Sequence, residues 1–240
     1  MTIRDNLKRV EDRIADACAK ANRDPSEITL VAISKRKTVA DILEAVDAGL
    51  RHIGENRVEE GVEKIPQVNA VAAGRVVWHM VGHVQSRKTK HVLRHFDTVQ
   101  SVDSLKIAKR LSRLSREVDR RLNVFIEINV SGEASKYGLE GYNWYGNASV
   151  REKLWHEVSE IVALPQLDVA GLMTMAPFDA EESAIRRVFA DLSGLRDEMA
   201  ASLPAKLPEL SMGMTDDYQI AIEEGATTIR IGRALFGERL

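Results

Sequence analysis

The sequence predicts an α/β protein built as a single (β/α)8 TIM barrel with an extra N-terminal helix. Short apolar runs alternate along the chain with segments of helical periodicity, which is the pattern of a parallel α/β fold. Most of these runs are apolar throughout, as expected for strands that helices cover on both faces. About eight such runs in 240 residues fit one closed barrel.

A leading helix precedes the first candidate strand. Ile3, Leu7, Val10 and Ile14 recur at helical spacing between charged residues, which predicts an amphipathic helix and not a signal peptide. The candidate strands follow at residues 29–34, 51–55, 75–82, 97–103, 123–130, 168–175, 210–214 and 228–237. The clearest helical segments between them are residues 39–49, 104–121, 151–164 and 182–203.

An open doubly wound sheet is the alternative architecture. No G-x-G-x-x-G motif follows the first candidate strand, so the dinucleotide-binding fingerprint of that fold is missing. The sequence also has no linker rich in Pro, Gly or Ser and no low-complexity tract. We therefore expect residues 1–240 to form one domain.

Composition and charge argue against several classes of function. The formal net charge of −2 gives no electrostatic reason to expect nucleic acid as a partner. No run is long and apolar enough to span a bilayer, and the single cysteine, Cys18, suits a reducing compartment. The six histidines show no metal-ligand spacing. We expect a cytoplasmic protein that binds neither membrane, nucleic acid nor metal.

Two cationic residues lie where a barrel carries its functional groups. Lys35 directly follows the first candidate strand, and a lysine in a desolvated pocket loses its proton more readily and can form a Schiff base. A solvated loop lysine is the alternative interpretation. Arg230 lies between isoleucines in "TIRIG", which indicates either a specific acceptor or a strand end open to water.

Glycine-containing loops follow the last two candidate strands. "SMGMTDD" leads into a helix at Asp216 or Asp217, and Gly232 lies between the last strand and the following helix. Free backbone N–H groups in such loops bind anions, and phosphate sites recur after strands 7 and 8 of barrels. The alternative is that the glycines serve only tight turns. A Schiff-base lysine, a phosphate cradle and a strand arginine together suit pyridoxal 5′-phosphate.

Six segments carry a resemblance to a known family. They read "VAISKRKT", "IGENRVEEGVEKI", "WHMVGHVQSRK", "INVSGEASKYG", "GLMTMAP" and "LSMGMTDDYQIAIEEGATTIRIGRALFG". In order and spacing, from about residue 5 to residue 239, the chain resembles the pyridoxal phosphate homeostasis proteins (YggS/PROSC family). The resemblance implies a barrel like the N-terminal domain of alanine racemase.

The resemblance also implies a set of residues around the cofactor ring. Lys35 would hold pyridoxal phosphate as a Schiff base, Asn56 of "GEN" would lie beside the ring, and Arg230 would face the pyridine nitrogen. His79 of "WHMVG" and Met173 of "GLMTM" would line the pocket.

The two loops that the resemblance assigns to the phosphate hold the remaining residues. These are Ser211, Met212, Gly213 and Thr215 in the first loop and Ile231 and Gly232 in the second. Lys136 of "ASKYG" matches a family lysine implicated in moving the cofactor in or out. The chain departs from the family pattern at Thr38 and Arg87, which replace proline and asparagine, and in the aromatic-rich residues 139–155.

The charge of Arg230 bears on the choice between a carrier and an enzyme. A permanently charged guanidinium discourages protonation of the ring nitrogen and makes the ring a weaker electron sink. A racemase would also need an opposing acid/base group from a second domain, which we do not expect here. We expect a monomeric, non-catalytic carrier that buffers pyridoxal phosphate, with apo-enzymes as candidate recipients. The alternatives are a racemase-like enzyme that uses Lys37, His79 or Tyr137 as second base, and a cofactor-free class I aldolase that uses Lys35.

Overall fold

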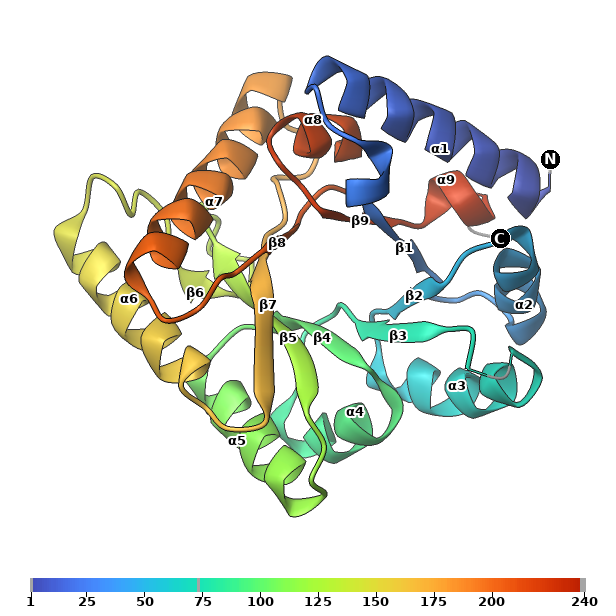
Figure 1. Cartoon of the computed structure of the whole chain (residues 1–240), viewed down its shortest axis with the longest axis horizontal. Helices are drawn as coiled ribbons and strands as arrows, with labels where there is room; N and C mark the ends of the chain where they lie inside the picture. The colour runs from blue at the N-terminus through green and yellow to red at the C-terminus, as the bar shows by residue number, and fades with distance from the viewer. Residues whose placement is uncertain (1, 73, 238–240) are drawn as a thin grey trace.

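Strands from the whole length of the chain form one closed, parallel β-barrel inside a ring of helices (Figure 1). The computed structural model describes residues 2–72 and 74–237. Neighbouring strands run in the order β4-β3-β2-β1-β9-β8-β7-β5, and pairing between β4 and β5 closes the ring. The barrel strands are β1 Thr29–Ile33, β2 His52–Glu55, β3 Val77–Met80, β4 Thr98–Val102, β5 Leu122–Asn129, β7 Leu167–Met173, β8 Glu209–Ser211 and β9 Thr228–Ile231. The predicted barrel is therefore confirmed.

Helices cover the outer face of this barrel (Figure 1). They are α1 Ile3–Lys20, α2 Val39–Ala48, α3 Val58–Ala72, α4 Thr89–His95, α5 Leu105–Glu117, α6 Ala148–Val162, α7 Glu182–Ser202, α8 Tyr218–Glu223 and α9 Arg233–Phe236, with 3₁₀ turns η1 Pro25–Glu27 and η2 Ser86–Lys88. α1 packs against the short helices α8 and α9, and Asn6 Nδ2 donates to Leu235 O over 2.7 Å. The extra N-terminal helix thus covers the side of the barrel that α8 and α9 are too short to cover.

Two local features differ from the predicted elements. The last candidate strand, residues 228–237, is a strand only as far as Ile231, because the N–H groups of Leu235 and Phe236 donate to Gly232 O and begin α9. A short strand β6, Leu139–Glu140, pairs with β5 beside the barrel and was not predicted. Two residues are too few to form an apolar run that a sequence pattern can detect.

The two faces of the barrel strands differ in polarity. Outward-facing aliphatic residues pack against the helices in one large core. A separate, small apolar cluster inside the barrel contains Val31, Ile33 and Val81. The buried polar side chains that share the interior with this cluster include His79, Gln100, Glu127, Ser211 and Arg230. The interior is therefore suited to binding a polar group, in contrast to a barrel filled with aliphatic layers.

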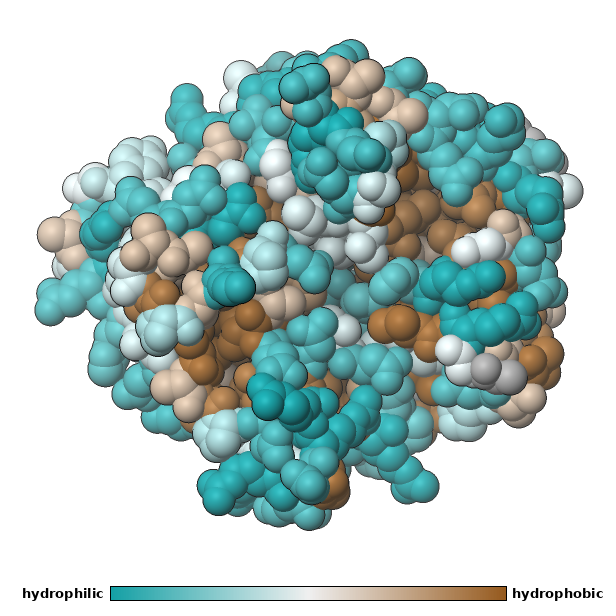
Figure 2. Space-filling view, viewed as in Figure 1, coloured by the Kyte–Doolittle hydropathy of each residue, from teal (hydrophilic) through white to brown (hydrophobic). Residues whose placement is uncertain are grey.

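The surface is mainly hydrophilic in the view of Figure 2, and hydrophobic residues show as patches nearer the centre. Among the residues that the structure describes, no helix combines the length and the apolarity needed to cross a membrane.

Candidate functional site

Lys35 lies just beyond the carboxyl end of β1. The strand ends at Ile33, Ser34 is buried, and Lys35 enters an exposed turn that is closed by a hydrogen bond of 3.0 Å from the Lys37 N–H to Ser34 O. Val31 and Ile33, the residues of β1 that precede this turn, lie inside the barrel. Lys35 is exposed, because the strand ends before it and the turn carries it to the rim; the sequence had left open both a desolvated lysine and a solvated loop lysine at this position.

Arg230 is enclosed in the barrel interior and is only 5% exposed. Its Nη1 donates to Ser211 Oγ over 2.6 Å, and its Nη2 donates to Thr174 O over 2.9 Å. Burial lowers the pKa of Arg230 to about 10, although the carboxyls of Asp217 and Glu127 oppose this shift. The guanidinium therefore stays charged at neutral pH, and it has the specific acceptors that a buried arginine needs.

A chain of polar contacts crosses the interior and ends at Arg230. His52 Nδ1 lies 3.0 Å from His79 Nε2, and Gln100 Nε2 lies 3.0 Å from His79 Nδ1. Ser211 Oγ donates to Gln100 Oε1 over 2.7 Å and accepts the bond from Arg230. Burial, with a smaller effect of His52, lowers the pKa of His79 to about 3, so this ring is neutral at physiological pH. Both of its nitrogens are engaged, and His79 thereby positions Gln100 and Ser211.

Two further residues of this interior, Gln100 and Glu127, were not predicted from the sequence. Each is a polar residue inside an apolar candidate strand, which is the signal that singled out Arg230. Burial, reinforced by Asp103, raises the pKa of Glu127 to about 7, while the charge of Arg230 opposes the shift. Glu127 is therefore an acidic residue of the interior whose charge interacts with that of Arg230, and it gains or loses its proton near neutral pH.

The loops that follow β8 and β9 lie on the same rim as the Lys35 turn. Gly213 has a φ of +95°, and a Cβ there would lie 2.6 Å from Ala221 Cβ, so this position requires glycine. Gly213 O accepts from the Arg230 N–H over 3.0 Å, which ties the first loop to β9. A Cβ on Gly232 would lie 3.5 Å from Ile33 O, which places the second loop beside the end of β1.

Ser211 ends β8 and Met212 begins the first loop, but their side chains are engaged away from the rim. The hydroxyl of Ser211 is shared between Arg230 and Gln100 inside the barrel. The side chain of Met212 packs in the large outer core. In this arrangement Ser211 positions the strand arginine, and Met212 anchors the loop.

Thr215, Ile231 and Gly232 lie closer to the rim. Thr215 is half-buried in the loop before α8, and Ile231 ends β9. An ion pair between Asp216 and Arg233 joins the two loops. The hydroxyl of Thr215 and the backbone N–H groups of these loops are the groups that this rim offers to an anion.

Asn56 contributes an unsatisfied polar atom beside β2. Its Oδ1 is buried and has no hydrogen-bond partner among the described residues. Gly82 approaches so closely that a Cβ there would lie 2.1 Å from Asn56 O. Met173 is buried at the end of β7. A buried amide oxygen without a donor is unfavourable in isolation, so it indicates a position for a donor of a bound ligand.

Lys136 connects two loops of the same barrel end. Its Nζ donates to Met175 O over 3.0 Å and forms an ion pair with Glu133, which joins the loop after β5 to the segment after β7. Tyr137 stacks on His83 with 4.0 Å between ring centroids. The loop that carries Lys136 is thus held to its neighbours by polar and aromatic contacts.

In segment 139–155, Trp144 and Trp155 pack against their neighbours, whereas Tyr142 and Tyr145 are exposed. Trp144 is buried, and the guanidinium of Arg151 lies 5.6 Å from its ring centroid and 4.3 Å from that of Trp155. These contacts hold the start of α6 to the preceding loop.

The rim as a whole combines an amine, backbone anion donors and a buried cation beneath them. This combination suits an anionic compound that carries a carbonyl group. Within residues 2–72 and 74–237, no group of three or more His, Cys, Asp or Glu side chains could hold a metal ion.

The closed parallel barrel places this chain in the class of proteins built like the N-terminal domain of alanine racemase. The family model described as "Alanine racemase, N-terminal domain" matches residues 3–240. The "Pyridoxal phosphate homeostasis protein" of Pasteurella multocida is 40% identical over 241 residues, which cover 100% of this chain and 98% of the relative. The chain belongs to the pyridoxal phosphate homeostasis protein family.

Two solved structures are similar over nearly the whole chain. An unknown protein from Bifidobacterium adolescentis is 35% identical with a TM-score of 0.88, covering 97% of this chain and 94% of that one. PipY of Synechococcus elongatus PCC7942, solved with PLP bound, is 33% identical with a TM-score of 0.80, covering 93% of this chain and 100% of that one.

Proposed function

We propose that this protein binds pyridoxal 5′-phosphate through a Schiff base on Lys35 and acts in intracellular pyridoxal phosphate homeostasis. The ligand is supported by the names of the homologous homeostasis proteins and by the PLP-bound structure of PipY. When bound, pyridoxal phosphate supplies an aldehyde, with which a lysine amine forms a C=N bond and releases water.

The residues of the rim and interior fit this cofactor. The buried, charged guanidinium of Arg230 is the single observation that carries the proposal, because it offers a donor for a ring nitrogen from the barrel interior. Arg230 pairs in register with Val31 on β1, the strand that leads to Lys35. The unpartnered Oδ1 of Asn56 offers an acceptor, and the close-packed Gly213 loop offers backbone donors for a phosphate.

Borohydride reduction followed by peptide mapping tests the Schiff base. We expect a pyridoxyl group on Lys35 of the wild-type protein and none at that position in Lys35→Ala, which should retain part of its affinity through the phosphate and ring contacts. A protein that stays colourless with added pyridoxal phosphate would instead favour the class I aldolase. A reduced adduct on another lysine would contradict the assignment of Lys35.

We propose a non-catalytic role because two of the residues considered as a second acid/base, Lys37 and His79, have their nitrogens engaged with other groups. Lys37 Nζ donates to Phe236 O over 3.0 Å, and both ring nitrogens of His79 contact other side chains. Arg230 in addition weakens the ring as an electron sink, since it discourages protonation of the ring nitrogen.

Isotope exchange separates a carrier from a racemase. The loaded protein is incubated in deuterated water with each enantiomer of common amino acids. We expect no incorporation of deuterium at the α-carbon and no racemisation. Turnover that disappears in Lys35→Ala would show a racemase-like enzyme instead.

Buffering and delivery form the cellular part of the proposal. The protein would lower the free concentration of a reactive aldehyde and pass it to apo-enzymes as a cytoplasmic monomer. The rate at which an apo-enzyme gains activity is compared for the loaded protein and for free pyridoxal phosphate at the same free concentration. Equal rates would limit the role to buffering, and sedimentation analysis checks the monomer.

A further inference from the structure

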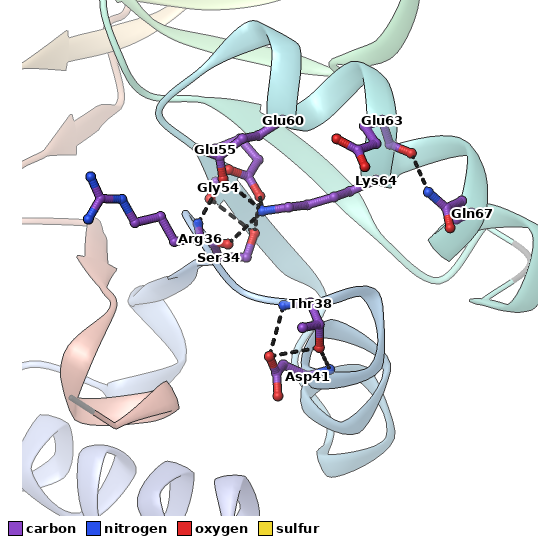
Figure 3. Close-up of polar contacts among 10 residues, drawn as sticks. All are labelled: Ser34, Arg36, Thr38, Asp41, Gly54, Glu55, Glu60, Glu63, Lys64 and Gln67. Carbon is purple, nitrogen blue, oxygen red and sulfur yellow. Dashed lines mark hydrogen bonds and ion pairs between the residues drawn. The ribbon is translucent and has the colours of Figure 1, made fainter. Parts of the chain in front are cut away.

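A cluster of buried polar side chains lies on the outer face of the barrel, between the ends of β1 and β2 and helix α3 (Figure 3). Lys64 Nζ donates to Glu55 Oε1 over 3.0 Å and to Glu60 Oε2 over 2.9 Å. Ser34 Oγ donates to the same Glu55 oxygen over 2.7 Å. The cofactor contacts proposed above include none of these side chains, so the cluster needs a separate explanation.

The ion pair between Lys64 and Glu60 also binds the backbone on both sides of Lys35. Lys64 Nζ donates to Ser34 O over 3.0 Å, which is the carbonyl of the peptide before Lys35. Glu60 Oε2 accepts from the Arg36 N–H over 2.7 Å, which is the amide after Lys35. One charged pair on one turn of α3 therefore fixes both peptides that flank the lysine (Figure 3).

The backbone of this turn needs such support. Arg36 has a φ of +61°, a left-handed conformation that is sterically unfavourable for a long side chain such as arginine and is common mainly for glycine, asparagine and aspartate. Positive φ at this position, with the Lys37 N–H bonded to Ser34 O, is the pattern of a type II turn, in which the central peptide is flipped relative to a type I turn. The bond from the Arg36 N–H to Glu60 stabilises that flipped peptide.

Net stability is a poor explanation for the cluster. Glu55 is fully buried, and the side chain of Lys64 is only 11% exposed. Burial raises the pKa of Glu55. Burial also acts to raise the pKa of Glu60, but the hydrogen bonds from the Arg36 N–H and from Lys64 outweigh this effect, and the pKa of Glu60 is lowered. Buried ion pairs often stabilise no more than apolar residues of equal volume, yet they can specify one arrangement.

We propose that Glu60 and Lys64 form a clamp that positions Lys35 for reaction with the aldehyde of pyridoxal phosphate. This inference rests on the proposed Schiff base and adds two positioning residues that lie outside the barrel. The clamp holds the turn that carries Lys35 at the rim, directly after the carboxyl end of β1. Apparent affinity falls with the population of the competent state, so a loosened turn weakens the covalent part of binding. The ring and phosphate contacts come from other strands and remain.

Two ligands that differ only at the reactive group separate these parts of binding. Pyridoxal phosphate can form the imine, whereas pyridoxamine phosphate carries an amine in place of the aldehyde and cannot. We expect Glu60→Ala to weaken binding of pyridoxal phosphate and to slow formation of the reducible adduct, each about tenfold, with the affinity for pyridoxamine phosphate changed by less than about twofold. Glu60→Gln keeps an acceptor for the Arg36 N–H and should fall between Glu60→Ala and the wild type. Glu63→Gln, on an exposed position of the same helix, is the matched control and should equal the wild type.

A rescue experiment tests the geometry of the turn itself. Glycine adopts left-handed φ values without strain, so Arg36→Gly added to Glu60→Ala should recover most of the lost affinity for pyridoxal phosphate. A purely structural ion pair would leave the double variant as weak as Glu60→Ala. Should Glu60→Ala fail to fold, Glu60→Gln provides the decisive comparison.

Failure of the clamp and failure of the proposed function have different signatures. The clamp is overturned if the wild type is trapped on Lys35 while the Glu60 variants match its affinity and adduct rate. It is also overturned if the Glu60 variants lose affinity for both ligands equally. A wild-type protein without a Lys35 adduct overturns the proposed function itself.

Discussion

The buried carboxyl of Glu127 predicts a pH-dependent loss of stability that one substitution should remove. Glu127 is 3% exposed, and burial raises its pKa from 4.5 to about 7. Because the pKa in the folded state lies above that in the unfolded state, this group stabilises the fold fully below about pH 4.5 and loses that contribution as the pH rises through 7. The interval between the two pKa values corresponds to a change of about 3 kcal/mol in the free energy of unfolding, at roughly 1.4 kcal/mol per pH unit.

Urea unfolding of the wild type and Glu127→Gln between about pH 4.5 and pH 8 measures this contribution. Glutamine has a similar shape and cannot ionise, so the two proteins should have similar free energies of unfolding at pH 4.5. The variant should become more stable than the wild type by up to about 3 kcal/mol at pH 8. Other carboxyls titrate in both proteins and cancel in the difference, and exposed Glu63→Gln should show no trend. A difference between the wild type and Glu127→Gln that stays constant over this range would refute the reasoning.

Further predictions concern the strand arginine and two glycines. Arg230→Ala should weaken pyridoxal phosphate binding by about 1.5–3 kcal/mol in calorimetric titration, because it removes a charge-assisted contact; unchanged affinity would show that the assigned ring contact is wrong. Gly213→Ala should destabilise the protein by about 1–3 kcal/mol in thermal unfolding, since residue 213 has a φ of +95° and its Cβ would lie 2.6 Å from Ala221 Cβ. Gly194→Ala in α7, whose nearest contact would be 3.8 Å away, should instead stabilise by about 0.5–1 kcal/mol, and equal signs for the two glycines would contradict the argument.

Local sequence patterns were sufficient to find the barrel and two of its charged residues. An apolar run reports burial of a strand, and a cation within or directly after it stands out because an unpartnered buried charge is unfavourable. Lys35 and Arg230 were found in this way. Gln100 and Glu127 carried the same signal within their own strands. They were missed because the pattern alone does not say which polar residue of a strand has a partner.

By itself the sequence determined which apolar runs form the barrel strands and which polar residues directly follow them, since these depend on near neighbours in the chain. Only the tertiary structure decided which groups meet. Ser211 lies 111 positions from Gln100 and yet shares its hydroxyl between Gln100 and Arg230, and Lys64 lies 30 positions from the Ser34 carbonyl that it holds. The physical reason is that strand register and barrel closure choose the partners of each side chain, and a periodic pattern of apolar residues is the same for every choice of partner.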